Sequence, residues 1–253
     1  SSNRALWRKS SPILVPKRQR LFSRKKKKRG TAMSEILRLL IRPLGETILM
    51  IAASTLISTI LGGGLGILLF SLSQDRFAGK YPGALLVKRI ADRAINMFRS
   101  FPYVILMVLV LPLSRIIVGT SLGTIASIVP LSIAAIPFLA RIVESSLSEV
   151  DSGVIDAAIS CAASKTRILF AILIPEALPS LISGLTLTMI SLLGYSAMAG
   201  VIGGGGLGDL AIRYGYQRFR ADVMAVAVVA IVALVELIQW TGSMIIKRIK
   251  AAR

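Results

Sequence analysis

The sequence contains no histidine and only one cysteine, and both shortages exclude whole classes of chemistry. Without histidine the chain can build neither a histidine-ligated metal site nor a histidine general base. Cys161 alone cannot form an intrachain disulfide, which excludes a small secreted fold held together by disulfides. No nucleophile–base pair stands out in the rest of the chain. We therefore expect no catalytic residue, no metal site and no cofactor.

Acidic residues are also scarce, since 12 Asp and Glu stand against 31 Lys and Arg, for a net charge of +19. Residues 1–32 contain no acid and twelve of the basic residues: Arg4, Arg8, Lys9, Lys17, Arg18, Arg20, Arg24, Lys25, Lys26, Lys27, Lys28 and Arg29. This basic tail lacks apolar periodicity, so we expect it to be disordered. Three interpretations are open: it binds anionic lipid headgroups, it is an organelle-targeting segment, or the native protein starts at Met33. No nucleic-acid-binding fold accompanies it, so nucleic acid is not an expected partner.

Long apolar runs, by contrast, are abundant. Hydrophobic residues make up 54% of the 253 residues, against about 45–50% in soluble domains. About 20 apolar residues cross the hydrocarbon core of a bilayer. Five runs reach that length, at residues 44–72, 94–118, 122–142, 178–202 and 223–246. The sequence predicts an all-α polytopic membrane protein with five transmembrane helices, forming one domain over residues 33–253.

Small residues and prolines indicate how these spans pack and bend. The first span has a small residue at every fourth position: Ser54, Ser58, Gly62 and Gly66. Such a stripe lets helices approach closely in lipid. Pro102 and Pro112 are expected to kink the second span, because each removes a backbone donor. Residues 74–93, before that span, are predicted to be a polar linker.

The basic residues also predict the orientation in the membrane. Five spans place the two ends of the domain on opposite sides. Twelve Lys and Arg lie on the side of residues 74–93, the loop after the third span and the C-terminus, against six on the other side. The positive-inside rule puts the first side in the cytoplasm. The basic tail would reverse this count, which favours a native start at Met33.

The stretch between the third and fourth spans, residues 151–179, reads DSGVIDAAISCAASKTRILFAILIPEALP. It begins polar, turns apolar and is broken by two prolines, so we expect an exposed short helix that docks a partner. Asp156-Ala157-Ala158, Ala162 and residues 172–175 resemble the EAA loop of ABC-importer permeases. The family pattern is Glu-Ala-Ala, three residues, Gly, nine residues, then Ile-x-Leu-Pro. An ordinary amphipathic surface helix is the alternative interpretation.

Ala162 stands where that family pattern has glycine. Glycine tolerates a left-handed backbone conformation that alanine resists. The helix is therefore expected to run on, or to turn differently, at Ala162.

Further motifs resemble a narrower family, the methionine-importer permeases of bacteria. They are NMFRSFP at residues 96–102, RIIVGTS at 115–121, PEALP at 175–179, GYSAM at 194–198, GGLGD at 205–209 and YGY at 214–216. The resemblance extends over about residues 33–253.

That resemblance implies a permease subunit of the bacterial inner membrane. Two copies would form the pore as a homodimer, two cytoplasmic ABC ATPase subunits would dock on the loop helix, and a separate extracytoplasmic lipoprotein would deliver methionine. The implied ATPase contacts are Asp156, Ala157, Ala158, Ser160, Ala162 and Ser164. The implied translocation pathway or gate residues are Tyr195, Ser196 and Met198, with plain helix packing as the alternative for Met198.

Alternative functions come from related and unrelated classes. A permease for another small solute is the related one, because delivery proteins set much of the selectivity. A stand-alone channel or ion-coupled carrier fits the membrane composition but leaves the EAA-like spacing without a role.

Glu236 is a departure from the family and lies near the middle of the fifth span, where an ionised acid costs about 2.5–3.5 kcal/mol. Gln239 and Ser243 share its face, which is expected to point inward to the bundle or a wet cavity.

Overall fold

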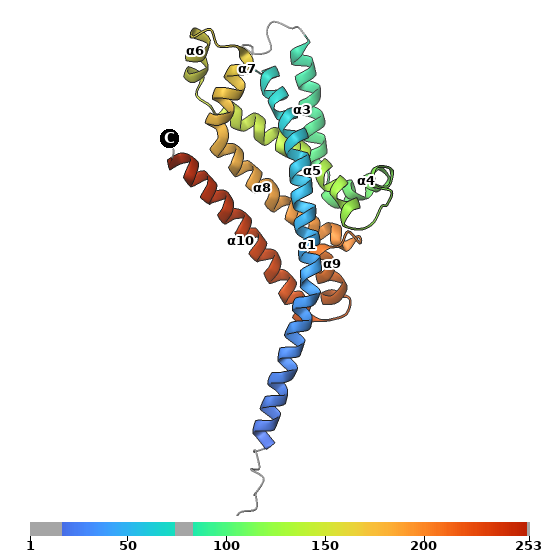
Figure 1. The fold of residues 1–253 in the computed structure, drawn as a ribbon. Coiled ribbons are helices and arrows are strands. Elements are labelled where there is room, and N and C mark those ends of the chain that lie inside the picture. The colour runs from blue at the N-terminus through green and yellow to red at the C-terminus, as the bar shows by residue number, and fades with distance from the viewer. Residues whose placement is uncertain (1–16, 74–82, 252–253) are drawn as a thin grey trace, which may run out of the picture. The chain divides into compact units, whose positions relative to one another are not determined.

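The computed structural model describes residues 17–73 and 83–251, and all regular elements among them are helical. In chain order these are α1 (Lys17–Ser73), α3 (Ala84–Ser100), α4 (Tyr103–Val118), α5 (Thr124–Ser148), α6 (Ser152–Ser160), α7 (Lys165–Arg167), η1 (Ile168–Leu173), α8 (Ile174–Val201), α9 (Gly206–Leu210), η2 (Ala211–Tyr216) and α10 (Ala221–Ala251). The chain divides into two units, residues 1–39 and residues 40–253. The architecture below is that of the second unit (Figure 1).

The predicted basic tail falls only partly within the described residues. Residues 1–16 lie outside them, and α1 begins at Lys17, inside the segment that was expected to be disordered. The proposed start at Met33, and the domain boundary there, stay predictions.

Four described helical stretches are long and apolar enough to cross a membrane: residues 37–73, 124–148, 165–201 and 221–251. The pair α3 and α4 passes the same test together, and counts as a fifth span if the bent pair crosses as one. Each of the five predicted apolar runs falls on one of these stretches. The predicted all-α membrane fold is confirmed.

The second span differs from its prediction. The helix breaks at Phe101 and Pro102, where α4 is bent by 107° from the direction of α3. Pro102 cannot donate a backbone hydrogen bond, and it also disfavours helical backbone at the residue before it, which explains a break rather than a mild kink. Pro112 lies inside α4 without ending it.

The predicted linker over residues 74–93 is wrong in its second half, because α3 already begins at Ala84. Two of the charged residues that suggested a linker are paired with α5. Asp92 lies 3.0 Å from Arg141, and Lys88 lies 3.6 Å from Glu144. Partnered charges lose less on burial, so the helix can pack one charged face against a neighbour.

The fourth span is also longer than predicted. It begins at Lys165 rather than near Leu178, because α7, the π-helical segment η1 and α8 follow one another without a gap. Pro175 lies in the first turn of α8, directly after the π-helical segment.

The small-residue stripe of α1 packs against α5, as the sequence predicts. A β-carbon on Gly62 would lie 2.7 Å from the carbonyl oxygen of Ile136, and one on Gly66 would lie 2.5 Å from that of Ala140. Ser54 is fully buried on the same stripe and donates a hydrogen bond to the carbonyl of Ile128. Small side chains therefore allow α1 and α5 to approach closely.

Candidate functional site

The loop helix α6 lies at one end of the bundle, beside α7 and at the same end as the start of α3 (Figure 1). Asp151 caps its N-terminus, since its Oδ1 accepts a hydrogen bond of 2.6 Å from the backbone N–H of Gly153. This carboxylate satisfies one of the donors that every helix leaves unpaired at its first turn. The sequence prediction of a short helix between two spans is confirmed.

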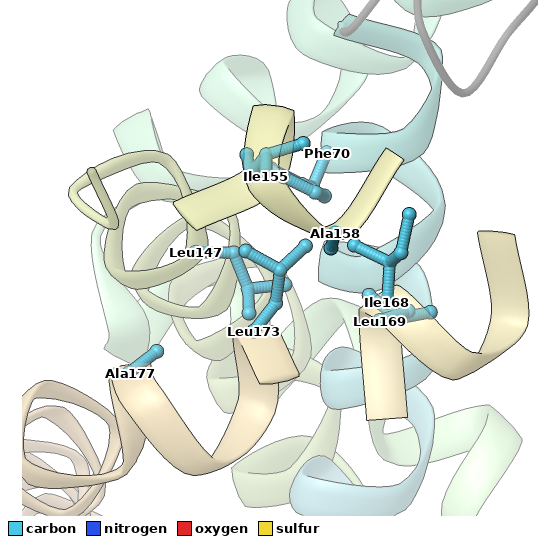
Figure 2. Close-up of a cluster of buried hydrophobic side chains, with 8 residues drawn as sticks. All are labelled: Phe70, Leu147, Ile155, Ala158, Ile168, Leu169, Leu173 and Ala177. Atoms are coloured by element: carbon cyan, nitrogen blue, oxygen red, sulfur yellow. The ribbon is translucent and has the colours of Figure 1, made fainter. Parts of the chain in front are cut away.

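The inner side of α6 is packed on the rest of the chain. Ile155 and Ala158 enter a buried apolar cluster that also contains Leu147 of α5 and Leu173 of η1 (Figure 2). Ala158 retains only 8% exposure. Its side chain therefore contacts the chain's own core, although the family resemblance implied a contact with a partner.

The outer side of α6 is open. Asp156, Ala157 and Ser160 are exposed, and the Ser160 hydroxyl donates to the backbone carbonyl of Asp156 at 2.9 Å. Of the six residues predicted to contact an ATPase, this face carries three. Their contact with a partner stays a prediction.

The turn after α6 corrects the expectation for Ala162. Ala162 adopts the left-handed conformation, with φ of 55°, in spite of its β-carbon. The N–H of Ala162 donates to the carbonyl of Ile159 at 2.9 Å, and the N–H of Ala163 donates to that of Ala158 at 3.1 Å. This hydrogen-bond pair is the Schellman motif that ends many helices, usually with glycine at the left-handed position. The helix therefore stops at this site with alanine in place of glycine.

A hollow of about 670 Å³ lies between α6 and the start of the following helical run. Its lining includes Val154, Ala157, Cys161, Ala162, Ser164 and Arg167. Ser164 begins the next helix, where its Oγ accepts a hydrogen bond of 3.3 Å from the N–H of Arg167. The hollow thus places small and apolar side chains next to one exposed arginine.

The three predicted pathway residues lie at the opposite end of α8. Met198 is 24 residues from Ile174, which at 1.5 Å per residue is about 36 Å along the helix. Only Met198 is well exposed, at 45%. Ser196 is buried and donates to the carbonyl of Leu193 at 2.8 Å. Tyr195 stacks on Tyr103 of α4, with ring centroids 4.5 Å apart.

Sequence reasoning missed a tertiary cap at that end of the molecule. Glu46 and Thr47 of α1 accept hydrogen bonds from the first two N–H groups of α9, those of Gly206 at 2.9 Å and Leu207 at 2.8 Å. A carboxylate also interacts favourably with the positive end of a helix. Two features of the sequence could have indicated this cap: Glu46 lies at the start of the first apolar run, and a run of glycines leads into the short helix α9.

The polar face of α10 does not point into the bundle of this chain. Glu236, Gln239 and Ser243 are all exposed. The opposite side of α10 packs on α8, where a β-carbon on Gly242 would clash with the side chain of Thr186. That this face points inward, to the assembled bundle or to a wet cavity, stays a prediction.

The helical order, the broken second span and the loop helix between the third and fourth spans together define an inner-membrane component of a binding-protein-dependent transport system. The family of that description matches residues 76–250, and the chain belongs to it. The predicted membrane location and the predicted kinship to importer permeases are confirmed.

Individual relatives narrow this family. The probable D-methionine transport system permease protein MetI of Vibrio cholerae is 42% identical over 211 residues, covering 83% of this chain and 92% of the relative. The methionine import system permease protein MetP of Bacillus subtilis is 47% identical over 159 residues, covering 63% of this chain and 72% of the relative. A solved structure of the inward-facing MetNI methionine ABC transporter superposes with a TM-score of 0.80 at 40% identity, covering 85% of this chain and 98% of that one.

Proposed function

We propose that this chain is the membrane-spanning subunit of an ATP-driven methionine importer. Two copies form the translocation pathway, a separate ATPase subunit binds each copy from the cytoplasm, and an extracytoplasmic binding protein delivers the substrate. The chain itself catalyses no reaction. The substrate follows from the relatives, whose names specify methionine or D-methionine transport.

The observation that carries the proposal is the two-sided character of α6. Its inner side is anchored by Ile155 and Ala158, while its outer side presents Ala157 beside a hollow of about 670 Å³. A helix whose inner side is packed on the core and whose outer side is exposed can bind a partner and transmit that partner's movement to the bundle. Small exposed side chains allow the close approach that such docking needs.

The anchoring contacts also indicate how that force would reach the pathway. The cluster beneath α6 joins Leu147 of α5 to Leu173 at the start of the fourth span. A displacement of α6 would therefore move α5 and α8 together, because closely packed interiors transmit displacement rather than absorb it. The far end of α8 carries Met198, whose flexible thioether is suited to fill and vacate a narrow apolar gap.

The test is a charge placed on the outer side of α6. Ala157→Glu should reduce ATP-driven methionine uptake by at least tenfold in vesicles containing the chain and its ATPase, because a buried, unpaired carboxylate would oppose docking. Ala251→Glu is the matched control, since it adds the same side chain at an exposed alanine on α10. Ala158→Glu is a poor test, because it would disrupt the core beneath α6.

Three measurements interpret the result. Membrane insertion of Ala157→Glu should be normal, and copurification of the ATPase should be lost. Uptake at the level of the Ala251→Glu control would contradict the docking role of α6. Competition by excess unlabelled methionine, but not by other amino acids, tests the substrate separately.

A further inference from the structure

The helix α3 presents three different surfaces. One side packs on α5 through the ion pairs of Lys88 and Asp92. The opposite side is apolar and exposed, at Leu86, Ile90 and Met97. Between them lie Arg89 and Arg93, one residue after each of the paired charges and both exposed.

Arg89 and Arg93 have no acidic partner among the described residues, although the adjacent Lys88 and Asp92 are both paired. They are four residues apart on one helix, so their side chains are neighbours on its surface. Two adjacent cations without a carboxylate repel each other, and a bound anion would remove that repulsion. The pair therefore has a charge that the described chain does not complement.

The depth of this arginine pair follows from the contacts of its neighbours. Arg89 follows Lys88, which pairs with Glu144, and Arg93 follows Asp92, which pairs with Arg141. Arg141 lies seven residues before the end of α5 at Ser148, which is about 10 Å along the helix. This is the end of the bundle that carries α6 (Figure 1). Arginine side chains starting at this depth can extend to the headgroup level.

We propose that Arg89 and Arg93 bind the phosphate of an anionic phospholipid, with Leu86, Ile90 and Met97 in contact with its acyl chains. The guanidinium group suits this ligand, because its planar fork of N–H donors can bind phosphate oxygens in pairs. The position at the boundary between charged and apolar surface matches the two parts of a lipid. A soluble phosphate would satisfy the arginines alone and leave the apolar side without a role.

The experiment titrates lipid onto the full chain in detergent and counts bound lipid by native mass spectrometry. The probe is palmitoyl-oleoyl phosphatidylglycerol, and phosphatidylcholine with the same acyl chains is the uncharged reference. The test variant is Arg89→Gln/Arg93→Gln. The matched control is Lys247→Gln/Lys250→Gln, which removes two exposed cations three residues apart from one helix, α10.

We expect the parent chain to retain phosphatidylglycerol in preference to phosphatidylcholine. The test variant should bind phosphatidylglycerol about thirtyfold more weakly, since each basic residue near a lipid surface contributes about a fivefold factor. The control should bind it as the parent does, and Arg89→Lys/Arg93→Lys should bind it with intermediate strength, because the charge remains but the paired N–H donors are lost. Circular dichroism and gel filtration should be the same for all variants.

Three outcomes would overturn the proposal. Undiminished phosphatidylglycerol binding by the test variant would show that the arginines do not hold the lipid. Equal losses of phosphatidylglycerol binding in the test and control variants would show that the lipid responds to the net charge of the chain and not to this arginine pair. Displacement of the lipid by millimolar glycerol phosphate would assign the arginines to a soluble phosphate instead. None of these readouts depends on methionine transport, so the proposed function stands or fails separately.

Discussion

The turn after α6 and the turn before α9 both use left-handed backbone, and they meet that need with different residues. After α6 the left-handed residue is Ala162, whereas before α9 the positive φ angles belong to Gly203, Gly205 and Gly206. The turn after α6 is exposed and closed by its own backbone hydrogen bonds. The turn before α9 is instead held by α1, through Glu46 and Thr47.

The difference lies in the space around each turn. A β-carbon on Gly205 would lie 2.8 Å from an Oε2 atom of Glu46, and one on Gly206 would lie 2.7 Å from the Oγ1 of Thr47. Ala162 is exposed, so its β-carbon has room. An alanine in left-handed backbone costs about 1–2 kcal/mol from local strain alone. The crowded turn would bear that strain together with a steric clash, which is why only the open turn can hold alanine.

Gly206→Ala is the variant with the largest expected effect, and it tests whether crowding distinguishes the turn before α9 from the turn after α6. It should destabilise the folded chain by about 2–4 kcal/mol, because backbone strain and the clash with Thr47 act together. Thermal unfolding in detergent, followed by circular dichroism, should show a lower midpoint. Gly64→Ala is the control: Gly64 is helical, with nothing within 4 Å of its added β-carbon, and should be neutral or slightly stabilising. A Gly206→Ala midpoint equal to that of the control would show that crowding is not the deciding factor.

A smaller loss is expected from Glu46→Ala. The change leaves the N–H of Gly206 without its acceptor, and losing a helix cap typically costs about 1–2 kcal/mol. Thermal unfolding and hydrogen exchange around α9 measure it. Glu46→Gln keeps an acceptor and should lose less. If the alanine and glutamine variants unfold at the same temperature as the parent, the turn before α9 does not depend on α1.

The smallest effect, and one of opposite sign, is expected from Ala162→Gly. Relief of left-handed strain should exceed the entropy lost by a freer unfolded chain, for a net gain of about 0.5 kcal/mol. Ala157→Gly is the control, because Ala157 lies inside α6, where glycine costs about 0.5–1 kcal/mol. Opposite shifts of the unfolding midpoint would sharpen the comparison, and a loss in both variants would argue against strain at Ala162.

The sequence predicts the spans and the position of the loop helix well, but it predicts the contacts of individual residues poorly. Asp156, Ala157 and Ala158 are neighbours in one motif, yet only Ala158 turns into the core. Residues 84–93 look like a linker because they carry charges, yet they are helical, and two of those charges, Lys88 and Asp92, pair with Glu144 and Arg141. Glu236 is exposed in this chain, because α10 packs on α8 through another side. Each of these contacts involves a partner far away in the chain.

The sequence by itself determined that this protein is helical and lies in a membrane, where its spans run, and that an EAA-like loop separates the third span from the fourth. These properties depend mainly on local runs of about 20 apolar residues and on short spacings. Only the tertiary structure decided which side of α6 is open, how far α3 bends from α4, and that Glu46 caps α9 across 160 positions of sequence. Those properties depend on which distant side chains neutralise a charge or fill a space. Local pattern cannot encode such contacts, because the same helix can satisfy its backbone hydrogen bonds whichever face it buries.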